Sequence, residues 1–216
     1  MAAYQFAQDA HILPTPAGIF YAVSTEAADK TRYFLLSLLA QADSQVLDEE
    51  FLIRATGSKD AEEAMELLYR AQGLGWVQAE QQPREAPVGI MEEVLPGILG
   101  KLSSTRKVLL VDNQGLFLSA HGFSYELAEE LSVLSADLTS LYVRHQRLLK
   151  NNINIASSAW ALVNSHGDSE LGIWPLHVGG CQFNLVLMGA PQFNQQAFVD
   201  LIWVLSKRYL DLPDSY

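Results

Sequence analysis

His177 and Cys181 are the two residues whose types and spacing could do chemistry together. A cysteine thiol beside an imidazole base is an arrangement used in nucleophilic catalysis. Gly179 and Gly180 stand between them, and a glycine pair is typical of the tight turn that joins two antiparallel strands. The spacing therefore predicts that His177 and Cys181 lie on neighbouring strands. For a lone cysteine we expect the role of a small buried apolar residue rather than a nucleophile.

Recognisable catalytic motifs are absent from the sequence, which contains no GxSxG, no P-loop and no HExxH. The remaining histidines are His11, His121, His145 and His166, and none has a second ligand at metal-binding spacing. We therefore expect no enzymatic activity, no cofactor and no metal site, and we assign no catalytic, cofactor-binding or metal-binding residue.

A small basic cluster at residues 101–107 holds Lys101, Arg106 and Lys107. It could contact a nucleotide phosphate or an acidic patch on a partner, and the simpler interpretation is a solvated loop. The chain as a whole has a net charge of −11 and a pI of about 4.8. Such a surface repels nucleic acid and anionic membranes, so we expect neither as a partner.

The first ten residues have no basic start and no long apolar run, so no signal peptide is predicted there. No segment reaches the roughly 18 uncharged apolar residues that a membrane helix needs. The single cysteine excludes an intrachain disulfide and a multi-cysteine metal cluster. These features favour a cytoplasmic protein.

The polar stretch around residues 80–89 holds two prolines and a glycine and shows no periodicity, which is typical of a linker. We predict an N-terminal domain over residues 1–82, a linker over 83–89 and a C-terminal domain over 90–212. Residues 1–85 carry a net charge of −7 and the rest −4, so neither part is a basic module.

In the N-terminal part we expect a short strand over 17–23 and helices over 31–42 and 48–55. A third helix follows Ser58, which we predict as its N-cap because acidic residues occupy the next turn. Gly73 ends that helix, and a strand over 76–79 follows. Three helices and a strand resemble a winged-helix domain.

DNA binding by this module is disfavoured by charge. In a DNA-binding winged helix the third helix enters the major groove, where phosphate neutralisation needs lysine and arginine. The acidic positions of that helix, namely Asp60, Glu62, Glu63 and Glu66, outnumber Lys59 and Arg70.

The sequence of the C-terminal part predicts helices and strands in alternation. A helix over 90–102 contains Pro96, which predicts a kink or a restart. A β-hairpin over 107–112 and 115–121 follows, then a long helix behind Ser124 as N-cap, strands over 155–165, 170–178 and 181–189, and a last helix from residue 194. The predicted fold is thus α+β, with five antiparallel strands.

The long helix carries leucines at alternating steps of four and three. These positions are Leu127, Leu131, Leu134, Leu138, Leu141, His145 and Leu148. The repeat is a heptad seam, which packs either on the sheet or on a second helix. We predict Leu127, Leu131, Leu134, Leu138, Leu141 and His145 as candidate dimer contacts.

The segment 107–122 has the sequence KVLLVDNQGLFLSAHG. An aliphatic strand, Asp-x-x-Gly, a second strand and a helix that begins LAEEL at Leu127 resemble the signature of roadblock/LC7 (dynein light chain) domains. The resemblance covers about residues 90–210 and implies an αββαβββα sandwich with a five-stranded antiparallel sheet. The long second helix and the winged-helix-like extension depart from the family's usual form.

This resemblance implies a regulatory rather than a catalytic protein. Roadblock domains form dimers by joining sheets edge to edge with their second helices packed together, and many dock small Ras-like GTPases or motor components. We therefore expect a homodimeric, non-enzymatic regulator or scaffold that docks a protein partner, with a Ras-like GTPase as a candidate. Two alternatives stay open: a dimeric transcriptional regulator that binds DNA through the winged-helix-like part, and a small-molecule sensor.

Overall fold

The computed structural model describes residues 10–27 and 29–210. The chain divides into two compact units, Met1–Val88 with Asn194–Tyr216, and Gly89–Phe193. The prediction about a signal peptide falls largely on residues 1–9, and the predicted end of the second domain falls on 211–212; both lie outside the described residues. None of the helices in the described part is both long and apolar enough to cross a membrane.

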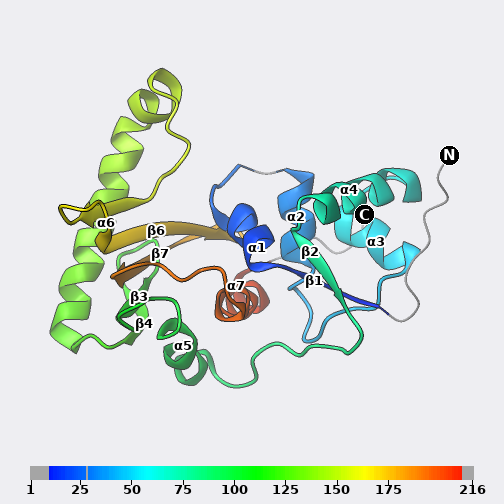
Figure 1. The fold of residues 1–216 in the computed structure, drawn as a ribbon, viewed down its shortest axis with the longest axis horizontal. Helices are drawn as coiled ribbons and strands as arrows, with labels where there is room; N and C mark the ends of the chain where they lie inside the picture. The colour runs from blue at the N-terminus through cyan, green and yellow to red at the C-terminus, as the bar shows by residue number, and fades with distance from the viewer. Residues whose placement is uncertain (1–9, 28, 211–216) are drawn as a thin grey trace. The chain divides into compact units, whose positions relative to one another are not determined.

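The first unit combines helices with a two-stranded antiparallel sheet, in which His11 pairs with Glu80 and Pro14 with Val77 (Figure 1). Its elements are β1 (His11–Pro14), α1 (Pro16–Val23), α2 (Lys30–Ser37), α3 (Glu49–Thr56), α4 (Ala61–Gly73), β2 (Val77–Glu80) and α7 (Gln196–Tyr209).

Helix α1 replaces the strand predicted over 17–23, and that prediction was wrong. Thr15 caps the helix by accepting a hydrogen bond from the Gly18 N–H, and Pro16 occupies the first helical turn, where a missing N–H costs nothing. A Cβ on Gly18 would collide with the backbone of Trp76. The apolar residues of this segment fit either a helix or a strand. The cap and the close approach of Gly18 to Trp76 therefore determine that it is a helix.

Two other boundaries differ from the sequence prediction. Helix α2 ends at Ser37 rather than near residue 42. The N-cap of α4 is Asp60, whose side chain accepts a hydrogen bond from the Glu63 N–H at 2.9 Å, and not Ser58. Aspartate is as good a cap as serine, so spacing alone could not separate the two.

The winged-helix prediction for this part is not confirmed. Helices α2, α3 and α4 followed by β2 match the predicted order, but β2 pairs with β1, which precedes all of them. Within the described residues the first unit is thus a helical layer with a β1–β2 ribbon.

Helix α7 groups with this first unit, whereas the sequence prediction includes it in the C-terminal domain. The Trp203 side chain is fully buried and donates from Nε1 to the Gln41 carbonyl at 2.8 Å. Arg84 forms an ion pair with Asp200 at 3.2 Å. These contacts connect α7 to residues that lie more than a hundred positions earlier, which no local sequence signal could indicate.

The second unit holds the five-stranded antiparallel sheet, in the order β4-β3-β7-β6-β5. Its elements are α5 (Met91–Leu99), β3 (Val108–Val111), β4 (Phe117–His121), α6 (Tyr125–Gln146), the π-helix η1 (Arg147–Asn152), β5 (Trp160–Val163), β6 (Ser169–Val178) and β7 (Cys181–Met188). The five predicted strands and the long helix are present.

Both predicted hairpins form as their turn residues indicate. The Asp112 side chain accepts hydrogen bonds from the backbone N–H groups of Gln114 and Leu116, and Gly115 has a φ of 82°. Gly179 and Gly180 have φ values of 60° and 76°, which fits a two-residue turn between β6 and β7.

Three details of this unit differ from expectation. Helix α5 is continuous across Pro96, so the predicted restart is absent, and the alternative of a kink stays a prediction. Strand β5 begins at Trp160, not near residue 155. The chain before it continues the helical path of α6 as η1, a π-helix without buried residues.

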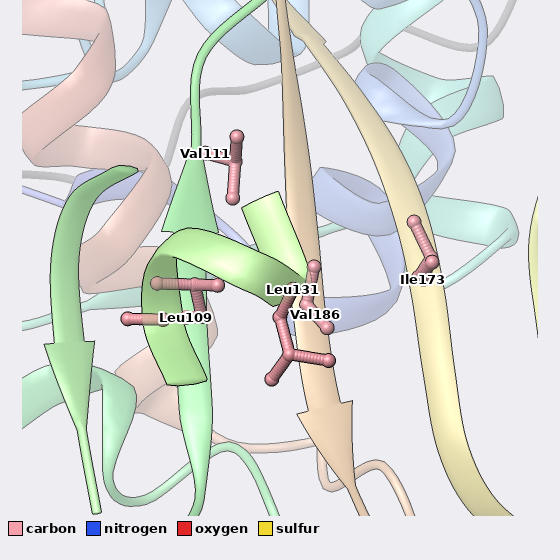
Figure 2. Packing of buried hydrophobic residues seen from close by; sticks show 6 residues of the cluster. Leu109, Val111, Leu131, Ile173 and Val186 are labelled. Atoms are coloured by element: carbon pink, nitrogen blue, oxygen red, sulfur yellow. The ribbon is translucent and has the colours of Figure 1, made fainter. Parts of the chain in front are cut away.

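One core of this unit lies between α6 and the sheet (Figure 2). Leu109 and Val111 of β3, Val186 of β7 and Ile173 of β6 meet Leu131 from the helix there. Burying an aliphatic side chain of this size contributes about 1.5–3 kcal/mol relative to exposure, so this face fixes α6 on the sheet.

Candidate interaction surface on helix α6 and strand β5

His177 and Cys181 do not form a catalytic pair. Cys181 is the cross-strand partner of Val178, and His177 is the partner of Gln182. Because neighbouring residues of a strand point to opposite faces and cross-strand partners share a face, His177 and Cys181 lie on opposite faces of the sheet. Among the residues the structure describes, no cluster of three or more histidine, cysteine or acidic side chains could hold a metal ion.

The basic cluster at 101–107 lies in a well-anchored loop. The Ser104 N–H donates to the Ala190 carbonyl at 3.0 Å, and the Thr105 hydroxyl donates to the Met188 carbonyl at 2.9 Å. Arg106 and Lys107 are exposed. Both the solvated-loop interpretation and an acidic partner remain compatible with this arrangement.

Helix α6 is built on a face of small residues. Its predicted cap is confirmed, since Ser124 accepts from the Leu127 N–H at 3.3 Å. The buried residues of the helix are Ala128, Leu131, Ser132 and Ser135. Small side chains let the helix axis approach the sheet closely, and their hydroxyls donate to carbonyls of the preceding turn.

The predicted dimer contacts share Leu131 with this buried face and otherwise lie beside it. Leu131 is buried at 9% exposure and Leu138 packs against the edge of the core, whereas Leu127 and Leu134 are 40% and 39% exposed. Leu141 is half-buried and His145 is exposed. The leucine seam therefore lies along one flank of α6, partly on the core and partly open to solvent.

This flank points to the β5 side of the sheet. Ala136 faces the β3–β4 turn, where a Cβ added to Gly115 would lie 3.3 Å from its side chain. Residues two apart on a helix are separated by about 200° around the axis, so Leu134 lies on nearly the opposite flank from Ala136. Leu138 packs against the core cluster that also includes Ile173 of β6.

Strand β5 is an edge of the sheet and carries exposed apolar side chains. Within the described ranges it pairs with β6 alone, and Leu162 and Val163 are 66% and 59% exposed. An edge strand offers unpaired backbone groups to another strand, and natural proteins usually protect such an edge with charges. Here β5 carries no charged residue.

The C-terminal half of α6 continues past the strands (Figure 1). Its exposed apolar residues include Val143 at 62% and Leu148 at 49%, and Ile153 beyond η1 is 54% exposed. Leu148 lies on the same flank of α6 as Leu127 and Leu134, whereas Val143, nine residues from Leu134, lies on the opposite flank. We call the exposed apolar residues of the leucine flank and of β5, namely Leu127, Leu134, Leu148, Leu162 and Val163, the α6–β5 surface.

Two solved structures are similar to part of this chain. A roadblock/LC7 domain from Streptomyces avermitilis is similar to this chain at 14% identity, over 52% of this chain and 87% of that one, with a TM-score of 0.33. Myxococcus xanthus MglB is similar at 16% identity, over 54% and 85% of the two chains, with a TM-score of 0.30.

The C-terminal segment has the element order α5-β3-β4-α6-β5-β6-β7, which is the αββαβββ part of the sandwich that the roadblock/LC7 resemblance predicts. No protein-family model matches the chain, and no curated protein matches it. At the identities and TM-scores of the two solved structures, no function follows from the similarity.

Sequence reasoning missed two parts of the surface on this roadblock-like segment. The exposed pair Leu162 and Val163 was assigned to a longer strand, and its position at a sheet edge depends on the order of strands. The sheet-facing residues Ala128, Ser132 and Ser135 were also overlooked, although their spacing of four and three is the same as that of the leucines.

Proposed function

We propose that this chain is a non-enzymatic regulator or scaffold that homodimerises through the roadblock-like segment and docks a protein partner. The observations that carry the proposal are the exposed leucines on one flank of α6 and the uncharged edge strand β5 of the sheet that α6 covers. Pairing of two β5 edges would satisfy the hydrogen-bonding groups of their backbones. In the proposed dimer, the leucine flanks of the two α6 helices would also meet.

The proposed partner is a protein rather than a nucleic acid, and the proposed location is the cytoplasm. A net charge of −11 disfavours phosphate backbones, and the exposed part of α4 includes Glu62 and Glu66. A small Ras-like GTPase is the candidate that the roadblock resemblance implies. The two alternatives, a DNA-binding regulator and a small-molecule sensor, gain no support from the residues that the structure describes.

Sedimentation velocity of the purified chain at micromolar concentration tests the dimer. We expect a dimer of the 23.9 kDa chain that dissociates on dilution. A strict monomer at these concentrations would contradict the proposal.

Docking is tested in two steps. Proteins retained from a native lysate by the immobilised chain are identified first, and a retained GTPase is then purified and tested for direct binding in its GDP and GTP forms. Direct binding that depends on the nucleotide supports the regulator role. If only DNA fragments are retained at low salt, the transcriptional alternative replaces it.

A further inference from the structure

Strand β4 forms the second edge of the five-stranded sheet, at the end of the strand order opposite to β5. Within the described ranges β4 pairs with β3 alone (Figure 1). Its sequence, FLSAH, contains no aspartate, glutamate, lysine or arginine, although such charges commonly protect an edge strand from further pairing. The register with β3 shifts at Leu118, so the regular part of this edge covers residues 119–121.

The hydrogen bonds of β3 show which backbone groups of β4 face outward. The Lys107 carbonyl accepts a hydrogen bond from the Met188 N–H of β7 at 3.0 Å. Because the residues of an inner antiparallel strand bond to its two neighbours in alternation, the next residue, Val108, bonds to its β4 partner His121. Ala120, one residue before His121, therefore directs its N–H and C=O away from the sheet.

Two cations lie at the end of this edge. A Cβ on Gly122 would lie 2.7 Å from the Arg106 carbonyl oxygen and 3.1 Å from the Lys107 side chain, so the chain after β4 passes directly beside both residues. Arg106 and Lys107 are exposed, and none of the ion pairs found over residues 10–27 and 29–210 involves either one. No acidic residue occurs between Glu93 and Asp112, although the net charge of the chain is −11.

The loop that carries these cations is held in place by hydrogen bonds. The Arg106 N–H donates to the Ser103 carbonyl at 3.1 Å, and the Ala190 N–H donates to the Ser104 hydroxyl at 3.0 Å. Arg106 has a φ of 58°, a conformation that an arginine keeps only where its surroundings impose it. A partner that binds here therefore loses little free energy to the ordering of this loop.

Apolar side chains lie beside the start of β4. Leu116 is 62% exposed and Tyr125 is 64% exposed, and the Tyr125 ring meets the Phe117 ring edge-on with centroids 5.4 Å apart. Glu126 and Glu129 are exposed on the same turn of α6 as Tyr125. The start of this edge thus favours apolar side chains and repels carboxylates, whereas its end attracts them.

We infer that the β4 edge binds an extended segment of a partner protein as a sixth strand, with carboxylates of that segment on Arg106 and Lys107. This inference rests on the proposed docking role and adds the surface and the chemistry of the partner. Strand addition combines main-chain hydrogen bonds with side-chain contacts that select the ligand. Every pairing in this sheet is antiparallel, so the carboxylates belong to the N-terminal end of the segment and its apolar residues follow.

A synthetic peptide tests this directly on the full chain. The probe carries three acidic residues at its N-terminal end, followed by alternating valine and threonine, which favour a strand. Fluorescence anisotropy of the labelled peptide should show saturable binding that weakens as salt rises. The same peptide in reversed order should bind more weakly, and a peptide with N-methyl groups at alternate backbone positions should not bind, because it lacks the donors that pair with the edge.

Two variants of the chain separate the backbone and charge contributions. Ala120→Pro removes the outward N–H and keeps the ladder to β3, since proline is tolerated on the open side of an edge strand, and it should abolish binding. Arg106→Glu/Lys107→Glu should raise the dissociation constant roughly tenfold or more. Circular dichroism and thermal unfolding check that both variants are folded.

The matched control for net charge is Arg147→Glu/Lys150→Glu, which changes two exposed cations on η1 by the same amount. It should leave the dissociation constant of the peptide unchanged. Sedimentation velocity of Ala120→Pro is a further control and should show the same self-association as the wild type.

The absence of saturable peptide binding up to millimolar concentration overturns the inference. So does binding that is equal for the N-methylated peptide, or equal in the folded Ala120→Pro variant, because the contact would then be electrostatic without strand addition. Loss of self-association in Ala120→Pro would assign the edge to a second copy of the chain and would also overturn it.

These results are independent of the proposed dimer and of GTPase docking. If the wild-type chain dimerises and docks a GTPase but fails the peptide tests, the inference is wrong and the proposed function stands. If the chain is a monomer that retains no GTPase yet passes the peptide tests, the proposed function is wrong in those respects and the β4 site stands.

Discussion

Asn184 of β7 donates a hydrogen bond from its Nδ2 to the Oγ1 of Thr139 on α6 at 2.9 Å. Asn184 is only 3% exposed, so its amide depends on protein partners. The bond joins β7 to a residue in the C-terminal half of α6.

Thr139→Val should destabilise the fold by about 1–3 kcal/mol, because it removes the nearer acceptor of the buried Asn184 amide and leaves that amide only the Ser135 carbonyl at 3.5 Å. The shape of the side chain is nearly unchanged, so packing should not contribute. Chemical denaturation measures the change. Ser140→Ala, at the exposed neighbouring position, is the control and should differ from wild type by less than about 0.5 kcal/mol. Equal stability of the two variants would argue against this hydrogen bond.

The leucine seam gives a second prediction, which separates folding from assembly. Leu131→Asp should reduce stability by several kcal/mol, because it places an unpaired carboxylate in the core under α6. Leu134→Asp should change stability by no more than about 1 kcal/mol, because Leu134 is 39% exposed, yet it should abolish the proposed dimer.

Thermal unfolding and sedimentation distinguish these effects. Leu116→Asp at the β3–β4 turn is the matched control, since Leu116 is exposed and lies away from the leucine flank. It should leave both properties unchanged. A dimer that survives Leu134→Asp would exclude this flank from the interface.

Short-range chemistry made the sheet predictable. The Asp112–Gly115 turn, the Gly179–Gly180 turn and the Ser124 cap each act within a few residues, and all three form as expected. The apolar runs between these turns and the cap fitted one type of secondary structure each. The five strands and the long helix could therefore be derived from local sequence.

Features that depend on contacts between residues far apart in the sequence could not be predicted from the sequence. The strand predicted over 17–23 is helix α1, and Gly18 packs against the backbone of Trp76, nearly sixty residues away. Likewise the spacing of the leucines identified a stripe on α6, but not which part of it the sheet covers. Leu131 and Leu134 fit the same repeat, and the residues of β3, β7 and β6 that meet Leu131 decide which one is buried.

The two candidate caps of α4 give a third prediction. Asp60→Ala should cost about 1 kcal/mol, because the Asp60 carboxylate accepts the Glu63 N–H. Ser58→Ala should be neutral or slightly stabilising, since the Ser58 hydroxyl is buried and has no hydrogen-bond partner. Chemical denaturation of the two variants side by side measures both. The reverse order of effects would restore Ser58 as the cap.

A final prediction concerns pH and the Tyr21 side chain. Its ring stacks on Trp76 with centroids 4.0 Å apart, and its hydroxyl donates to Asp29 at 3.1 Å. Burial, and then the hydrogen bond to Asp29, raise the pKa of Tyr21 above its ordinary value of 10.0. The folded state therefore favours the neutral phenol more than the unfolded state does.

A raised pKa gives stability that is fully present below pH 10.0 and is lost as the pH rises through the folded-state value. The stability of the wild type relative to Tyr21→Phe should thus be constant at neutral pH and fall above pH 10.0. Denaturant unfolding of both proteins across this pH range gives the difference between their free energies of unfolding. The other tyrosines and the lysines titrate in both proteins, so their contributions cancel in this difference. A difference that stays constant with pH, or that grows in alkali, would show that the Tyr21 phenol is not shifted in this direction.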